Sequence, residues 1–356
     1  SNCILFSDAW SYNSLTNFPQ LDMSSATTVS NAWRGNNLTE FPVIDMPNCT
    51  NFASAWHSNN LTSFPLINVS SGNNFGASWL NNNLTSFPKL DMSSATKVGN
   101  AWRDNNLTEF PAIDMPNCTD FFYAWNNNSL TNFPLIDMSS ATNVESAWRS
   151  NNLTEFPAID MPNCTDFFYA WFNNKLTEFP LIDTSSATNF FGTWHSNNLT
   201  EFPLIDASSV TNFQSAWIGN NLTSFPLINT SSGTNFANAW RDNNLTSFPL
   251  IDTSSGTDFT SAWQNNNLTS FPKLDMSNAT TVQTAWRGNS NLSDFPANMF
   301  DNCSCTNFIL AFTDINLSQT SIDNILVSIE SNGTSNGTFD QSGGSAPSSV
   351  GETAID

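Results

Sequence analysis

Histidine, cysteine and carboxylate side chains most often carry catalysis or bind metal ions, and their spacing in this sequence of 356 residues favours neither role. The only two histidines, His57 and His195, each follow a tryptophan but lie six units apart in the repeat described below. No Ser/His/Asp or Cys/His group can be assembled around them, and no glycine-rich phosphate loop is present. Glu178 and Glu201 occupy equivalent positions in neighbouring units, where a solvated face is the simpler interpretation. We therefore predict that the protein is not an enzyme.

The cysteines are not spaced for disulfides or for zinc. Four of them, Cys3, Cys49, Cys118 and Cys164, fall at the same phase of the repeat, two or three units apart. At roughly 5 Å per unit their Cα atoms would lie about 10 to 15 Å apart, beyond disulfide reach. We expect small buried residues in a turn. The "CSC" of residues 303–305 is too tight for an easy bridge and too poor in partners for zinc.

Carboxylates recur at one position of the repeat, and they leave two interpretations open. A column of carboxylates about 5 Å apart could bind Ca²⁺ between units, or could cap the following turn through Asx hydrogen bonds. Replacement by Asn68 and Asn229 in two units favours the cap. Without a cation, mutual repulsion should raise some of their pKa values. The column comprises Asp22, Asp45, Asp91, Asp114, Asp137, Asp160, Asp183, Asp206, Asp252 and Asp275.

The positions beside the repeated Ala-Trp pair vary between units and are the candidate ligand-binding stripe. The residue after the tryptophan includes all five arginines, and the two residues before Ala-Trp include the pairs Phe122-Tyr123 and Phe168-Tyr169. Such side chains are common binding anchors and stack on sugars. A plain solvent-exposed edge is the alternative. The candidates are Arg34, His57, Arg103, Tyr123, Arg149, Tyr169, Phe172, His195, Arg241 and Arg287.

A second variable column follows each Phe-Pro and holds four consecutive leucines, Leu181, Leu204, Leu227 and Leu250. If these leucines point outward, they form an apolar patch that could pack against a partner. Burial beneath the chain's own adjacent segment is the alternative. Glycosylation is a further candidate modification, although Asn-x-Thr sequons arise readily in an Asn/Thr-rich repeat. The candidate sequon asparagines are Asn37, Asn60, Asn106, Asn152, Asn198, Asn221 and Asn244.

The element that positions all these columns is a repeat of 23 residues. Every interval between successive tryptophans has that length, and a fixed period of this size is the signature of a solenoid whose units fold by stacking on their neighbours. We predict a solenoid of 13 to 14 coils over residues 1–317, starting mid-coil. The tryptophans are Trp10, Trp33, Trp56, Trp79, Trp102, Trp125, Trp148, Trp171, Trp194, Trp217, Trp240, Trp263 and Trp286.

The apolar spacing within a unit predicts its local structure. Phe52, Ala55 and Trp56 have the i, i+3, i+4 spacing of one helical turn. Leu61, Phe64 and Ile67 are spaced by three, which suits an extended segment leading into a short parallel strand at "LIN" or "LID". An asparagine stands three residues after every tryptophan, and we predict a buried ladder of amides that bond to backbone groups. The next position, such as Asn37, should face water.

Composition limits the partners. The net charge is −21 with nine Lys+Arg, which argues against a nucleic-acid surface, and no run approaches the roughly 20 apolar residues that span a bilayer. Thirty Phe and thirteen Trp indicate a packed core. The first residue is not Met and lies mid-repeat, so we expect a processed or excised N-terminus.

The pattern changes after residue 317. Thr320 as N-cap, Asp323 at N3 and Asn332-Gly333 at the end predict an amphipathic capping helix within residues 318–333. Its expected apolar face is Ile322, Ile325, Leu326 and Ile329. Residues 334–356 read as a Ser/Gly-rich tail, whose final "ETAID" could open another helix.

The frame Leu-Thr-x-Phe-x-x-Ile-Asp-x-Ser-x-x-Thr-Asn-Phe-x-x-Ala-Trp resembles the BspA-type, or Mycoplasma-lipoprotein-type, leucine-rich repeat. The closing "FPANMFDNC" and "SIDNILVSI" are similar to the ends of such proteins in bacteria and tailed phages. The resemblance covers nearly the whole chain, and the fold that it implies is a right-handed, leucine-rich-repeat-like solenoid. It implies a cell-surface adhesin or a virion or tail-fibre component; the strict period and the Trp in every coil depart from the family pattern.

From these observations we predict a non-enzymatic extracellular or virion surface protein that binds a host-cell or environmental glycan or protein through the variable stripe. The alternative is a structural subunit of an extracellular filament or sheath that packs through its leucine column. We expect no cofactor other than Ca²⁺ at the Asp column, no nucleic acid, no membrane insertion, and a homo-oligomer.

Overall fold

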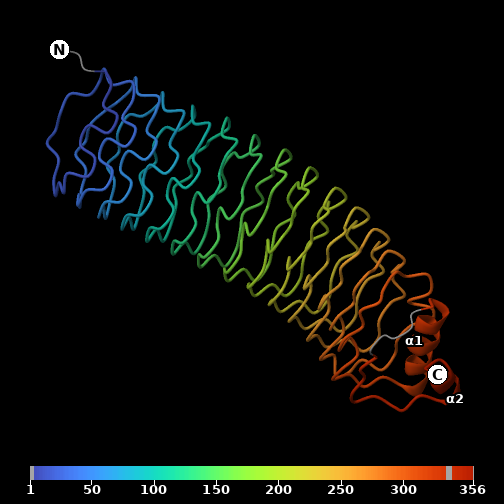
Figure 1. The fold of residues 1–356 in the computed structure, drawn as a ribbon. Helices are drawn as coiled ribbons and strands as arrows, with labels where there is room; N and C mark the ends of the chain where they lie inside the picture. Colours follow the sequence, from blue (N-terminus) through green and yellow to red (C-terminus); the bar gives the residue numbers. More distant parts are fainter. Residues whose placement is uncertain (1–3, 334–338, 356) are drawn as a thin grey trace. The chain divides into compact units, whose positions relative to one another are not determined.

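The computed structural model describes residues 4–333 and 339–355 (Figure 1). Within those ranges the helices are α1 (Gln319–Ser331) and α2 (Ser349–Thr353), and the preceding residues form coils joined by isolated parallel bridges. No helix of the described chain is long and apolar enough to cross a membrane. The predictions for Cys3 and for residues 334–338 of the tail lie outside the described residues.

The chain divides into two compact units, which are described separately. Unit 1 comprises Ser1–Leu176 with Ile182–Ser186, and unit 2 comprises Thr177–Leu181 with Ala187–Asp356. Bridges in both units join residues at equivalent positions of neighbouring coils, such as Thr28 with Asn51 in unit 1 and Asn212 with Asn235 in unit 2. Figure 1 shows these coils lying side by side within each unit. Each unit is therefore a repeat solenoid.

The segment before each tryptophan is not the helical turn predicted from its spacing. Ser54 has a φ of 54°, in the left-handed region. Phe52, Ser54 and Trp56 donate their backbone N–H groups to carbonyl oxygens of the next coil, at 2.8 to 2.9 Å. A helix would need those donors for its own i to i−4 bonds. Bonding between coils therefore replaces the helix with an irregular turn that still buries the same apolar residues.

The predicted strand at "LID" is also misplaced. The parallel bridges lie instead at the residue before each core Phe or Val, such as Asn51 and Asn74. At "LIN", the backbone N–H of Ile228 donates to the carbonyl oxygen of Pro226, only two residues earlier, at 2.9 Å, and at "LID" Ile205 does the same with Pro203 at 3.0 Å. This tight turn uses the donor that a strand would give to its neighbour.

Aromatic side chains stack from coil to coil and form the core. In unit 1, Trp33 stacks on Trp56 with ring centroids 5.4 Å apart, and Phe41 packs edge-on against Trp33 at 4.8 Å. Unit 2 repeats the arrangement, with Trp217 on Trp240 at 5.8 Å. The prediction of the core positions is confirmed for the representative coil. Its buried residues are Phe52, Ala55, Trp56, Leu61, Phe64 and Ile67.

Most of the buried indole N–H groups, including those of Trp33, Trp102 and Trp240, have no oxygen or nitrogen acceptor. A phenylalanine ring lies T-shaped against each of these indoles, as Phe110 does against Trp102 at 4.8 Å. Aromatic rings are weak acceptors for N–H groups. The packing of the rings therefore stabilises the stack of tryptophans. Phe312 can take the place of a tryptophan in this stack, because its ring stacks on Trp286 at 5.3 Å.

The predicted asparagine ladder is present in the structure. The side-chain Nδ2 of Asn59 donates to the carbonyl oxygen of Trp56 in its own coil at 3.1 Å and to that of Trp33 in the preceding coil at 2.8 Å. Its Oδ1 accepts the backbone N–H of Leu38 at 3.1 Å. Equivalent bonds recur in unit 2, for example from Asn243 to Trp217. Each amide therefore ties two coils together where the irregular backbone would leave polar groups unpaired.

Helix α1 covers the last coil of unit 2. Its N-cap is Ser318, not Thr320, and the Ser318 hydroxyl accepts the N–H of Ser321. The Ser321 hydroxyl accepts the N–H of Phe295 at 2.9 Å and donates to the carbonyl oxygen of Ser293 at 3.0 Å. Ile322, Ile325 and Leu326 are buried, whereas Ile329 is half-buried. Helix α2 begins before "ETAID", and Asp323 of α1 accepts the N–H and hydroxyl of Ser348.

Candidate functional site

The stripe beside the tryptophans was expected to be exposed but is half-buried. In unit 1, Asn126 in the same column is buried. All ten candidate residues have intermediate exposure; in unit 1 they are Arg34, His57, Arg103, Tyr123, Arg149, Tyr169 and Phe172, and in unit 2 they are His195, Arg241 and Arg287.

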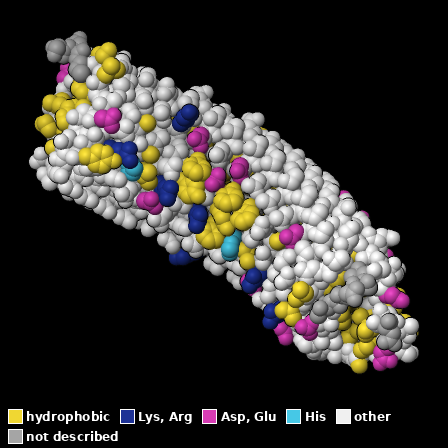
Figure 2. All heavy atoms as spheres, viewed as in Figure 1, with side chains coloured by type: hydrophobic (Ala, Val, Ile, Leu, Met, Phe, Trp, Pro, Cys, Tyr) yellow, Lys and Arg dark blue, Asp and Glu magenta, His cyan; other side chains and the backbone are white. Residues whose placement is uncertain are grey.

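Aromatic and arginine side chains of unit 1 gather across neighbouring coils. The guanidinium carbon of Arg103 lies 5.0 Å from the ring centroid of Tyr123, and that of Arg149 lies 5.2 Å from Tyr169 and 5.0 Å from Phe172. Figure 2 shows apolar side chains beside Lys and Arg side chains on the visible face. We call the following set the aromatic patch: Phe122, Tyr123, Arg149, Phe168, Tyr169 and Phe172.

The patch is unusual because it places tyrosines at a position where the backbone of the repeat is left-handed. Tyr123 has a φ of 55° and Tyr169 a φ of 52°. The same phase in other coils of unit 1 is occupied by Asn31, Ser54 and Ala77, which are smaller. A bulky side chain in this conformation is strained, and strain of this kind gathers at functional sites. Tyrosine therefore occupies both positions although the backbone conformation disfavours a bulky side chain.

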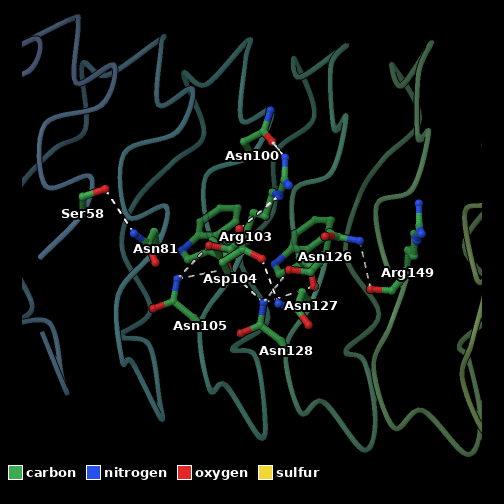
Figure 3. A network of polar contacts seen from close by, with 12 residues as sticks. Ser58, Asn81, Asn100, Arg103, Asp104, Asn105, Asn126, Asn127, Asn128 and Arg149 are labelled. Atoms are coloured by element: carbon green, nitrogen blue, oxygen red, sulfur yellow. Dashed lines mark hydrogen bonds and ion pairs between the residues drawn. The ribbon is translucent and has the colours of Figure 1, made fainter. Parts of the chain in front are cut away.

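A network of polar contacts fixes the arginines and the turn beside them (Figure 3). Arg103 donates to the Oδ1 of Asn100 at 3.2 Å and pairs with a carboxylate oxygen of Asp104 at 3.3 Å. The other carboxylate oxygen of Asp104 accepts the side-chain amide of Asn127 in the next coil at 2.8 Å. The amide of Asn126 donates to the carbonyl oxygen of Arg149 at 3.3 Å. The positive charge of Arg103 is thereby balanced within its own coil.

The coil between the two Phe-Tyr pairs has the acidic Glu145 and the small Ser146 at the equivalent positions. Sequence reasoning missed both residues. Ser146 is 0% exposed and its hydroxyl has no hydrogen-bond partner, whereas Ser54 at the same phase is half-buried. Burial, followed by the charge of Asp166, raises the pKa of Glu145. A column-by-column comparison of the repeats would have singled out this coil, because it interrupts the Phe-Tyr pairs.

Burial lowers the pKa of both histidines. Desolvation lowers the pKa of His57, with Arg34 adding to the effect. Desolvation also lowers the pKa of His195 to about 4; the charge of Asp242 raises this pKa by a smaller amount, and that of Arg241 lowers it. A histidine with so low a pKa is unprotonated at neutral pH.

The aspartate column forms turn caps. The carboxylate of Asp22 accepts the hydroxyl of Ser24 at 2.7 Å and its N–H at 3.0 Å. The serine hydroxyl bond, followed by the backbone bond, lowers the pKa of Asp22, Asp91, Asp206 and Asp252. The expectation that repulsion raises these pKa values is therefore wrong for these four residues.

Three aspartates depart from this pattern because proline follows two residues later and has no N–H to be capped. Asp45, which precedes Pro47, instead accepts the backbone N–H of Asn68 in the next coil at 2.7 Å. Asp114 and Asp160 bond the next coil in the same way. Across the described residues, no three His, Cys, Asp or Glu side chains are grouped to hold a metal ion.

The leucine column is exposed. Leu181, Leu204, Leu227 and Leu250 of unit 2 are each 63 to 64% exposed, so burial beneath the chain's own segment, the alternative interpretation, is wrong. On the equivalent face of unit 1, a shallow hollow of about 440 Å³ is lined by Leu66 together with charged residues and turn residues. The charged residues are Asp45, Lys89 and Asp91.

The remaining candidates are the sequon asparagines and the cysteines. The candidate sequon asparagines are exposed, apart from Asn152, which is half-buried. Cys49, Cys118 and Cys164 are free and buried, as expected. Cys303 and Cys305 are also buried, and the Cys303 sulfur accepts the backbone N–H of Cys305 at 3.3 Å.

Comparison with known proteins gives limited information. No protein-family model and no curated protein sequence matches the chain. Among solved structures, it resembles the leucine-rich effector protein YopM from Yersinia pestis, with a TM-score of 0.43 and 17% identity over 85% of this chain and 81% of that one. YopM from Yersinia enterocolitica gives a TM-score of 0.29 and 17% identity over 86% and 85% of the two chains. The description of the solenoid therefore rests on the contacts within this chain.

Proposed function

We propose that the chain is a BspA-type leucine-rich-repeat protein that acts as a non-enzymatic binding scaffold outside the cell or on a virion. The aromatic patch of unit 1 mediates adhesion or receptor binding. The observation that carries this proposal is the placing of two Phe-Tyr pairs in alternate coils, with Arg103 stacked on Tyr123 and Arg149 stacked on Tyr169. Aromatic and arginine side chains are the residues most enriched at the centres of binding sites.

Two features of the patch support a binding role. Its tyrosines stand at a left-handed backbone position where the fold does not require a bulky side chain, because Ser and Ala occupy the same phase in other coils. Its backbone is held by bonds between coils, such as Ser146 N–H to the carbonyl oxygen of Phe168 at 2.8 Å. A rigid surface loses little entropy when it binds.

The test is binding of the labelled full chain to host-cell or environmental surfaces. The variant Arg103→Ala/Arg149→Ala/Tyr169→Ala removes the stacked pairs and should lose at least about tenfold in affinity, because each anchor contributes on the order of 1 kcal/mol or more. Lys89→Ala/Lys175→Ala, which removes two exposed cations elsewhere in unit 1, is the matched control. Undiminished binding of the triple variant would rule out the patch.

The second candidate function is a structural subunit of an extracellular filament or sheath, assembled as a homo-oligomer through the leucine column. The exposure of Leu181, Leu204, Leu227 and Leu250 favours it. Electron microscopy and light scattering at high concentration should then show polymers that Leu204→Ser/Leu227→Ser disperses. Monomers at every concentration would exclude this function.

Glycosylation of the exposed sequons is consistent with either role. Mass spectrometry of the chain produced in a glycosylating host should show glycans at Asn37 and Asn60 before half-buried Asn152, if access decides modification.

A further inference from the structure

We infer that the ligand of the aromatic patch is a neutral glycan that lies across three neighbouring coils, an inference that rests on the proposed binding role of the patch. The coils are those of Trp125, Trp148 and Trp171, all within unit 1. The ligand class follows from the size of the patch, its charge and the groups between its rings.

The aromatic side chains are spread over a length that suits a short oligosaccharide. Phe122-Tyr123 and Phe168-Tyr169 lie two coils apart, which at the spacing of parallel strands is about 10 Å, comparable to a disaccharide unit of an extended glycan. Phe122 and Tyr123 pack edge-on with centroids 4.4 Å apart, and Phe168 and Tyr169 do so at 4.6 Å. Each pair therefore forms a rigid platform of the kind on which the C–H face of a sugar ring packs.

The coil between the platforms completes the surface. Ser146, which is 0% exposed, is small enough for the patch to continue over it. Half-buried Glu145 stands in the same coil, at the phase that holds phenylalanine in the coils on either side. A carboxylate between two aromatic platforms is suited to accept hydrogen bonds from sugar hydroxyls.

Charge argues against an acidic glycan. The chain carries a net charge of −21, which repels polyanions. Arg103 is already paired with Asp104, and the guanidinium of Arg149 lies over the rings of Tyr169 and Phe172. Asp120, Glu145 and Asp166 add negative charge along the same coils. The patch therefore lacks the open cluster of cations that an acidic glycan needs.

Size argues against a protein ligand. Five half-buried aromatic side chains expose on the order of 300 Å² together, whereas a standard protein interface buries about 800 Å² on each partner. A short oligosaccharide needs a smaller contact and is matched better by the patch.

The test uses the full chain and an array of neutral and acidic oligosaccharides, followed by calorimetry with the best binder. We expect a neutral glycan to bind with little dependence on salt. Phe168→Ala/Tyr169→Ala should weaken its binding at least about tenfold, because it removes one platform. Alanine occurs naturally at both phases, as Ala53 and Ala77, so the variant should fold.

Two further variants sharpen the test. Glu145→Gln should weaken binding several-fold without loss of thermal stability, whereas Glu109→Gln, an exposed carboxylate outside the patch, should bind like the wild type. Binding only to acidic glycans, with steep loss at high salt, would overturn the inference. If no glycan binds but a surface protein binds in a Tyr169-dependent manner, the glycan inference fails and the binding role stands. If nothing binds through the patch, both fail.

Discussion

At the scale of single residues, the repeat serves as its own comparison. An asparagine stands at the position of Asn59 in every coil, because its side-chain amide donates to two tryptophan carbonyl oxygens and accepts a leucine N–H. Its buried role could be predicted from its strict recurrence. Glu145 and Ser146 could be recognised only by comparing the coils column by column, because they interrupt the Phe-Tyr pairs of the coils on either side.

The asparagine ladder gives a prediction for stability. Asn105→Ala should lower the free energy of unfolding by roughly 3 kcal/mol, because the N–H of Leu84 and the carbonyl oxygens of Trp79 and Trp102 lose their buried partner. Its exposed neighbour Asn106 is the control, and Asn106→Ala should change stability by less than about 0.5 kcal/mol. Denaturant titration of the full chain measures both; equal effects would show that the ladder is not structural.

His195 gives a prediction for pH. The unfolded chain binds a proton at this site near the ordinary pKa of 6.5, whereas the folded chain binds it only near 4. Lowering the pH from about 6.5 to 4 therefore favours the unfolded state, and stability from this group is complete only above that window. His195→Gln, which places the residue found at Gln264, should reduce the fall in melting temperature across the window. A fall of the same size in the variant would assign it to other groups.

At the scale of elements, the sequence predicts which residues are buried better than it predicts the backbone. The i, i+3, i+4 spacing identified Phe52, Ala55 and Trp56 as core residues, but the turn is not helical because its N–H groups bond the next coil. The strand was placed at "LID", where a tight turn after proline uses the donor. Local patterns cannot reveal either outcome, because both are decided by a neighbouring coil.

Helix α1 gives a prediction at this scale. Ile325 is 0% exposed, and Ile325→Ala should destabilise unit 2 by about 2–4 kcal/mol through the cavity it leaves. Val327 on the same helix is 37% exposed, and Val327→Ala should cost far less. Proteolysis of the last coil should accelerate only in the first variant. If both variants are cut alike, α1 does not cap the solenoid.

At the scale of the whole molecule, the repeated positions and the variable positions have different roles. The stacked rings and the amide ladder recur within each unit, so they account for folding and carry no information about a partner. The aromatic patch, the feature that breaks the regularity most, belongs to three coils of unit 1. Solenoids commonly present binding surfaces in this way.

Footprinting of the three tyrosines tests the central claim most directly. The sequence has only Tyr12, Tyr123 and Tyr169, and Tyr12 is 68% exposed outside the patch. Hydroxyl-radical labelling of the full chain, with and without the surface or glycan that it binds, should show protection of Tyr123 and Tyr169 and an unchanged Tyr12. Protection of Leu204 and Leu227, with all three tyrosines unchanged, would contradict the account and place binding at the leucine column.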